Sequence, residues 1–227
     1  MPAESNGLME RLRSETRAHH DAAENQALQK ALVAGELGRE TYVRYLGQML
    51  LVHRALEPRI RALIDSRAEL GQAIHDDNFR EDDLVADLKT FGTDPADESL
   101  KPCAATAALI ADIERLAQTR PVALVGMHYV LEGANNGNRF IARAMAKALQ
   151  LTDGNGVRYL DPYGESQRER WQAYKTAMSG VTVDPAESDA IVDAAKRMFE
   201  AIGAISQEIA RTSDEQVAAA AAQATRT

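Results

Sequence analysis

Apolar residues recur along this chain every three or four positions, the spacing that places side chains on one face of an α-helix. One such stripe, over residues 8–32, consists of Leu8, Leu12, Thr16, His20, Ala23, Ala27 and Ala31. A second, over residues 39–67, consists of Tyr42, Tyr45, Leu46, Met49, Leu50, His53, Leu56, Ile60 and Leu63. Gly35 stands between them, and glycine commonly ends a helix. The pattern predicts two helices joined by a turn, with a bend at Pro58 in the second.

Helical spacing continues through the rest of the chain. We expect a short helix over residues 80–88 and further helices over 104–116, 121–149 and 166–178. Pro121 suits the first turn of the third of these. Asp184 is expected to cap a last helix that ends near Arg211. Since no segment shows sustained alternation of apolar and polar residues, the sequence predicts an all-α fold.

The stretch at 128–149, HYVLEGANNGNRFIARAMAKAL, carries a stripe with two glycines one turn apart, Gly133 and Gly137. Each glycine inside a helix costs about 1 kcal/mol relative to alanine, so a compensating role is expected. One explanation is a neighbouring helix packed closely against the bare backbone, which is the commoner meaning of G-x-x-x-G. The other is a flat, bulky ligand that lies against this face.

His20 lies on the first apolar stripe, and Glu24 follows one turn later on the same face. This geometry suits a metal-ligating histidine, whose second nitrogen is usually bonded to a carboxylate, carbonyl or water. His19 points about 100° away around the helix. At this spacing a half-buried histidine beside a solvated carboxylate is the commoner arrangement. His53, on the second stripe, is more often a core histidine than a catalytic one.

Composition narrows the function classes. The chain has 227 residues, of which 45% are hydrophobic, and a formal net charge of -8. We expect one domain over residues 8–211, a flexible N-terminus at 1–7 and a low-complexity, disordered tail at 212–227. The acidic balance disfavours nucleic-acid binding. No apolar run reaches the roughly 18 residues of a membrane span, and a single cysteine excludes a disulfide framework, so a cytoplasmic monomer without membrane insertion is expected.

Three separated motifs, in order, resemble the haem oxygenase family and together span about residues 8–210. ETRAHHDAAEN at 15–25 is similar to its proximal-helix signature, and RALE at 54–57 is another family landmark. EGANNGNRFIARAMAKAL resembles the distal helix, and YLDPYGES followed by W-x-x-Y is similar to the bacterial branch. The resemblance implies a single-domain helical bundle that holds haem b between the two helices. Haem would be substrate and cofactor, cleaved to biliverdin, carbon monoxide and ferrous iron.

The resemblance also implies roles for individual residues. His20 would be the axial iron ligand, with Glu24 hydrogen-bonded behind it, and Gly133 and Gly137 would leave room for dioxygen. The residues expected to serve the haem propionates are Arg13, Lys175 with Arg168 or Arg170, and His128. Cations beside Trp171 and Tyr174 are otherwise typical of a solvated surface. Since no G-x-G-x-x-G dinucleotide fingerprint is present, electrons would come from an external ferredoxin or flavoprotein reductase.

One departure from the family pattern concerns proton supply. The animal type has an aspartate directly after the first distal glycine, and this chain has Ala134. Asn135, Asn136 and the Gly133 backbone are candidate substitutes, and His53 lies where others have a tyrosine of the same network. Asn138 also replaces a small residue. Two alternatives stay open: a non-catalytic haem carrier or sensor on the same fold, and a helical interaction domain in which His20 is incidental.

Overall fold

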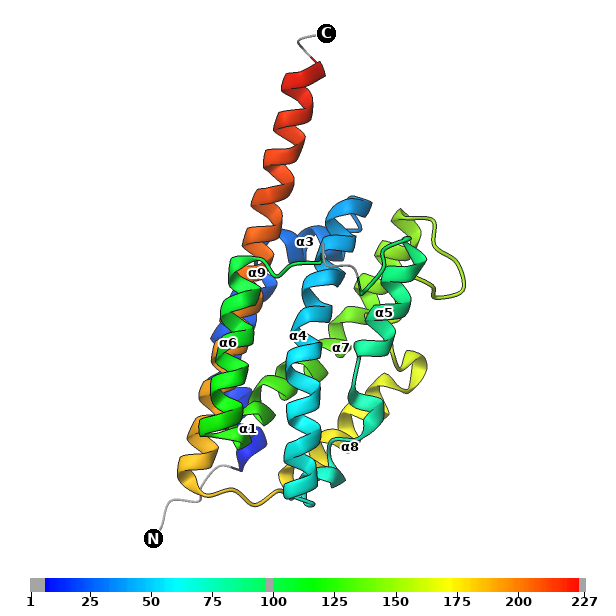
Figure 1. The fold of residues 1–227 in the computed structure, drawn as a ribbon. Coiled ribbons are helices and arrows are strands. Elements are labelled where there is room, and N and C mark those ends of the chain that lie inside the picture. The colour runs from blue at the N-terminus through cyan, green and yellow to red at the C-terminus, as the bar shows by residue number, and fades with distance from the viewer. Residues whose placement is uncertain (1–6, 97–99, 225–227) are drawn as a thin grey trace.

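A computed structural model describes residues 7–96 and 100–224, with side chains as far as Thr212. Its α-helices are α1 (Leu8–Glu15), α2 (Arg17–Glu24), α3 (Ala27–Ala34), α4 (Arg39–Ser66), α5 (Glu81–Thr90), α6 (Ala104–Thr119), α7 (Leu124–Ala148), α8 (Gln167–Ser179) and α9 (Pro185–Ala224). Short 3-10 turns lie at Leu70–Gln72, Asp76–Asn78, Pro121–Ala123 and Gly164–Ser166. Within the described residues there is no strand, which confirms the all-α prediction (Figure 1).

The single helix expected over residues 8–32 is wrong, because this segment forms three short helices. Side chains at the breaks compete with the backbone for its carbonyl groups. The Thr16 hydroxyl donates to the Leu12 carbonyl at 2.6 Å, and the Asn25 amide donates to the Asp21 carbonyl at 2.8 Å. The resulting changes of direction let α2 pack on α9 and α3 pack on both α7 and α9.

α4 runs through the middle of the molecule without a break at Pro58 (Figure 1). Proline cannot donate the usual backbone hydrogen bond. The side chain of the following residue, Arg59, donates a hydrogen bond to the Ala55 carbonyl at 2.9 Å within this part of the helix. Its inward stripe is buried against α5, α6, α7 and α9, so this helix forms the centre of the core.

α7 begins directly after the 3-10 turn at Pro121, as expected for a proline in the first turn. The connection after α7 is fixed by Asp87 of α5, a carboxylate with no exposed surface. It accepts hydrogen bonds from the backbone amides of Arg158 at 3.0 Å and Tyr159 at 2.9 Å. This connection brings Tyr163 against the inner side of α7, which matters for the site described below.

α9 starts with the expected cap, since the Asp184 carboxylate accepts from the Glu187 amide at 2.8 Å. The helix continues to Ala224, so its expected end near Arg211 is wrong. The alanine-rich run there has high helix propensity and no breaker. Its last turns project beyond the rest of the molecule (Figure 1). The N-terminal segment 1–6 and residues 225–227, both part of the predicted flexible ends, lie outside the described residues.

Membrane insertion was not expected from the sequence. Among the residues that the structure describes, no helix combines the length and the apolar character needed to cross a bilayer.

Candidate functional site

The glycine face of α7 is open in the middle of an otherwise buried stripe. Val130 and Ile141, at either end, are 3% and 6% exposed. Between them, a Cβ atom added to Gly137 would meet nothing within 4 Å. At Gly133 it would meet only the ring of Trp171 from α8, at 3.4 Å. The centre of this stripe is therefore open, with no neighbouring atom beside Gly137.

Gly126, two turns earlier on α7, shows what a helix-packing glycine looks like in this protein. A Cβ atom there would lie 1.9 Å from the carbonyl oxygen of Ile191 in α9. Close helix packing therefore explains Gly126 and does not explain Gly133 or Gly137. Of the two explanations that the sequence left open for the G-x-x-x-G pair, the structure favours a face kept clear for a ligand.

Two adjacent histidines on α2 have different surroundings. The Nε2 atom of His19 lies 3.4 Å from the Glu200 carboxylate of α9, and its Nδ1 atom is buried without a partner. The side chain of His20 is 51% exposed, with carboxylate oxygens of Asp21 at 3.7 Å from Nδ1 and of Glu24 at 3.5 Å from Nε2. Whichever nitrogen binds an external atom, a carboxylate is near the other. His20 is therefore the histidine available for ligation.

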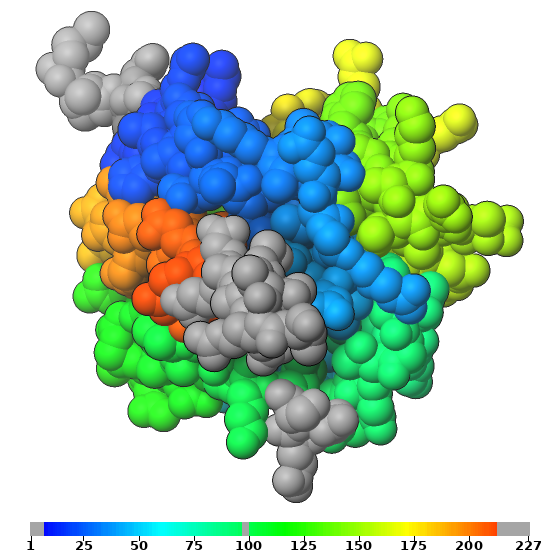
Figure 2. Space-filling view, turned by 90° about the horizontal axis from the view of Figure 1, so that it is seen from above, coloured from blue at the N-terminus to red at the C-terminus, as the bar shows by residue number. Residues whose placement is uncertain are grey.

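Within the described residues, the side chains of His20, Asp21 and Glu24 form a group that could hold a metal ion. They lie on the N-terminal helices, which form one wall of a notch in the molecular surface (Figure 2). The opposite wall is formed by the end of α7, the connection that follows it and α8. The open face at the α7 glycines and an accessible histidine on α2 therefore belong to elements that border the same notch.

Aromatic and basic side chains from α1, α7 and α8 gather at one end of this region. The ring of Tyr129 lies 5.8 Å from that of Trp171, whose face is 5.9 Å from the Lys175 ammonium. Burial raises the pKa of the Tyr129 hydroxyl, and the neighbouring Arg13 guanidinium opposes that rise. Arg13 and Lys175, far apart in sequence, are thus both near this aromatic pair, Arg13 at Tyr129 and Lys175 at Trp171. Such cations can bind the carboxylates of a ligand.

The other residues predicted to bind carboxylates lie elsewhere. Arg170 pairs with Asp77 and stacks on Tyr163, with its guanidinium carbon 5.2 Å from the ring centre. Arg168 is exposed and shares an open surface pocket with Glu165 and Glu169. Arg170 therefore has partners other than the Tyr129–Trp171 pair.

His128 is buried, with 4% of its surface exposed, and its Nδ1 atom lies 3.3 Å from the Tyr174 hydroxyl. Burial lowers the pKa of His128 to about 3, so its ring is neutral. Its neighbour Tyr129 is the α7 side chain close to Arg13. The sequence predicted His128 as the residue that binds the ligand's carboxylates. The geometry favours its neighbour Tyr129 for this role.

Comparison with known proteins identifies the family of this chain. A family model described as Heme oxygenase matches residues 6–208. The chain belongs to the haem oxygenase family. It is 25% identical over 193 residues to heme oxygenase 1 of Synechocystis sp. PCC 6803, covering 85% of this chain and 80% of that protein. To the heme oxygenase of Guillardia theta it is 24% identical over 183 residues, covering 79% and 76%.

Solved structures of haem oxygenases share the fold. That of Leptospira interrogans superposes with a TM-score of 0.81 at 26% identity, covering 89% of this chain and all of that one. Heme oxygenase-1 of Synechocystis sp. PCC 6803, solved in complex with heme, gives a TM-score of 0.84 at 23% identity over 97% of this chain. At 23% identity, the likeness to this Synechocystis structure establishes only that the two proteins share a fold. The prediction of a haem-oxygenase-like helical fold is confirmed.

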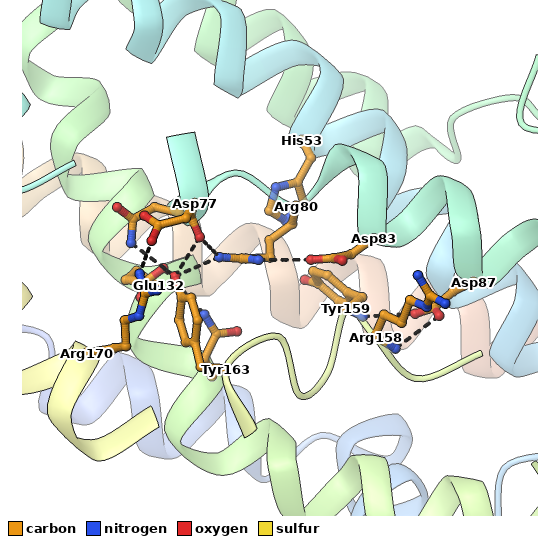
Figure 3. Close-up of polar contacts among 12 residues, drawn as sticks. His53, Asp77, Arg80, Asp83, Asp87, Glu132, Arg158, Tyr159, Tyr163 and Arg170 are labelled. Atoms are coloured by element: carbon orange, nitrogen blue, oxygen red, sulfur yellow. Dashed lines mark hydrogen bonds and ion pairs between the residues drawn. The ribbon is translucent and has the colours of Figure 1, made fainter. Parts of the chain in front are cut away.

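A buried polar cluster that the sequence did not reveal joins α7 to α4 and to the connections at Arg80 and Tyr163 (Figure 3). Ala134, the departure from the animal pattern, is exposed and offers no polar group. Asn135 is buried and donates to the Glu132 carboxylate at 3.4 Å. Asn136 turns back to the Gly133 carbonyl at 2.8 Å. Glu132 itself is only 2% exposed, and this buried carboxylate is the unexpected member of the site.

His53 belongs to the same cluster. Its Nδ1 atom lies 2.8 Å from the Glu57 carboxylate one turn along α4, and both side chains are buried. The same Glu57 oxygen, Oε1, also accepts a hydrogen bond from the backbone amide of Arg80 at 2.6 Å. A signal for the cluster was present in the sequence, because His128, Glu132 and Asn135 share helical spacing. A carboxylate on a buried helix face is rarely there without a partner.

Proposed function

We propose that this chain is a haem oxygenase that cleaves haem to biliverdin, carbon monoxide and ferrous iron with dioxygen and external electrons. The observation that carries the proposal is the open centre of the α7 stripe at Gly133 and Gly137, together with an accessible His20 on α2. Its relatives carry the name heme oxygenase, and one related structure was solved with heme.

The residues present fit haem on three counts. His20 offers a nitrogen that no protein group occupies closely, and a carboxylate stands near its other nitrogen. The α7 glycines leave part of that helix face without side chains, with open space at Gly137. Arg13 near Tyr129 and Lys175 near Trp171 are the cations that would bind the two propionates. When bound, haem supplies the iron that activates dioxygen and the ring that is oxidised.

The chain's own residues bind and orient this group. A carboxylate that accepts a hydrogen bond from the other nitrogen of His20 would strengthen the imidazole as a ligand. Trp171 restricts the space beside Gly133, whereas the space at Gly137 is open, so dioxygen has room on the Gly137 side. Charge-assisted bonds from Arg13 and Lys175 would hold the propionates and so fix the rotation of the ring in its plane.

Electrons are proposed to come from a separate ferredoxin or flavoprotein reductase. We further propose that the protein acts as a monomer in the cytoplasm.

The test is an absorption time course on haem-reconstituted protein under air, with ascorbate or a ferredoxin–reductase pair as electron source. Catalase removes free peroxide, which could degrade haem without enzymatic control. Loss of the Soret band together with growth of the broad biliverdin absorbance supports the proposal. A Soret band that persists through complete reduction refutes it.

A haem carrier or sensor is the second candidate, and Ala134 is the observation that favours it, since the carboxylate at this position is missing. A carrier binds haem through His20 and leaves the ring intact. In the same time course it would give a histidine-ligated spectrum that is stable under reductant.

A further inference from the structure

Two large apolar side chains are exposed among the described residues, Val33 of α3 at 59% and Phe140 of α7 at 62%. Single exposed apolar side chains are common on protein surfaces and need no explanation by themselves. These two differ from such cases in their position, because they belong to the two helices that meet at one end of the open α7 face.

Phe140 lies on the same face of α7 as the distal glycines. Gly133, Gly137, Phe140 and Ala144 follow one another at steps of four, three and four residues, the spacing of one helix face. A Cβ atom added to Gly137 would meet nothing within 4 Å. Phe140 is therefore the first large side chain on this face beyond the open space at Gly137.

The open part of this face ends where α3 meets α7. A Cβ atom added to Gly35, the residue directly after α3, would lie 2.9 Å from the Ala144 carbonyl oxygen and 3.4 Å from the Ala144 Cβ atom. Val33 precedes this contact by two residues of α3, and Phe140 precedes it by one turn of α7. Both exposed apolar residues thus stand where the glycine face reaches its closed end.

The two ends of this face differ in polarity. Arg13 is near Tyr129, in the first half of α7. Lys175 lies 5.9 Å from the ring of Trp171, which is next to the same tyrosine. At 1.5 Å per residue, Phe140 lies about 16 Å further along the helix axis than Tyr129. One end therefore offers cations and the other end offers apolar side chains.

Haem has the same asymmetry, with two propionates on one edge and methyl and vinyl groups on the edge opposite. If the propionates lie at Arg13 and Lys175, the opposite edge is directed along α7 toward Phe140. Exposed aromatic and branched aliphatic side chains gain free energy when an apolar surface covers them. The methyl and vinyl edge of haem would supply such a surface to Val33 and Phe140.

We propose that Val33 and Phe140 form an apolar wall that receives the methyl and vinyl edge of haem. This inference rests on the proposed function and deepens it. The wall and the two cations hold the ring from opposite edges, so together they fix its rotation in its own plane. That rotation decides which meso carbon lies beside the open space at Gly137. Val33 and Phe140 are thus positioning residues.

The first test measures the affinity for ferric haem, which requires no ring opening. Phe140→Ala should bind haem about three- to tenfold more weakly than the wild type, the usual size of an aromatic contact. Val33→Ala should weaken binding by a smaller factor, and Phe140→Leu should keep most of the affinity because it retains an apolar side chain. Val85→Ala on α5, a helix that packs on α4, is the control and should bind like the wild type.

The second test asks whether Phe140 meets the vinyl edge. Iron deuteroporphyrin has hydrogen in place of both vinyl groups and keeps the propionates. Phe140→Ala should weaken the binding of this ring less than it weakens the binding of haem. In the proton NMR spectrum of the cyanide-bound ferric protein, the haem methyl signals of Phe140→Ala should show a second ring orientation that the wild type and Val85→Ala lack.

The outcomes separate the two claims. Equal haem affinity in wild type, Phe140→Ala and Val33→Ala would overturn the wall and leave the oxygenase proposal standing. Unchanged methyl signals in Phe140→Ala would overturn its role in fixing the rotation. Thermal unfolding of the haem-free variants should match that of the wild type, and a lower Tm for Phe140→Ala would mean that this residue serves the fold. A wild type that binds haem and never opens the ring would refute the oxygenase proposal alone, and one that binds no haem would refute both.

Discussion

Gly137 offers a test of whether the distal glycines serve the fold or a ligand. A methyl group at this position would meet no atom within 4 Å, and the backbone there is helical. Alanine is favoured over glycine inside a helix by about 1 kcal/mol. The Gly137→Ala variant should therefore stabilise the haem-free protein by up to about 1 kcal/mol, which for a chain of this size raises Tm by roughly 2–4 °C.

The same methyl group would occupy the space that we assign to dioxygen. The variant should consequently bind haem through His20 and open the ring more slowly than the wild type. Thermal unfolding of the haem-free protein gives the first quantity, and the absorption time course gives the second. Greater stability combined with slower chemistry is the signature of a glycine retained for a ligand.

Gly126→Ala is the matched control on the same helix. Its Cβ atom would lie 1.9 Å from the Ile191 carbonyl oxygen, a backbone atom that can move only if α9 moves. Overpacking of this kind costs about 1–3 kcal/mol or more, so this variant should be destabilised. Destabilisation of Gly137→Ala by a similar amount would refute the reasoning, because it would mean that Gly137 also packs against the fold.

Three further predictions concern other residues. His20→Ala should abolish the histidine-ligated Soret spectrum, whereas His19→Ala should keep it; the reverse result would exchange their roles. Arg13→Ala and Lys175→Ala should each weaken haem binding by about two- to fivefold in a titration, since exposed charge pairs contribute up to about 1 kcal/mol, and unchanged affinity would remove them from the propionate site. Burial raises the pKa of Asp87 to about 6. The folded protein therefore binds this proton more tightly than the unfolded chain, and the associated stability is lost as pH rises from about 4 to about 6, by roughly 3 kcal/mol. The free energy of unfolding, measured with denaturant at both pH values, should show this loss in the wild type and not in Asp87→Asn. The same change with pH in both proteins would contradict the raised pKa of Asp87.

The helix pattern and the glycine pair could be predicted because periodicity reports which face of a helix is buried. Periodicity could not show which partner each of two adjacent residues contacts. Neighbours on a helix point about 100° apart, and the rotation of the helix about its axis is set by tertiary packing. His19 lies beside Glu200 of α9 and His20 packs edge-on against Phe199 of the same helix, and Tyr129 lies near Arg13 where His128 was expected.

Sequence patterns could not predict the contacts between distant segments. The cluster around Glu132 depends on Arg80 and Tyr163, which come from two connections whose course no local propensity defines. The breaks within residues 8–32 arise from single hydrogen bonds of Thr16 and Asn25 that periodicity does not detect.

The most direct test of the central claim is product analysis after one turnover in isotope-labelled dioxygen. Haem-reconstituted protein is reduced with a ferredoxin–reductase pair in the presence of catalase, and the products are identified by mass spectrometry. The proposed function predicts equal amounts of biliverdin and carbon monoxide, both carrying label from dioxygen. Intact haem, or ring fragments without carbon monoxide, would contradict it.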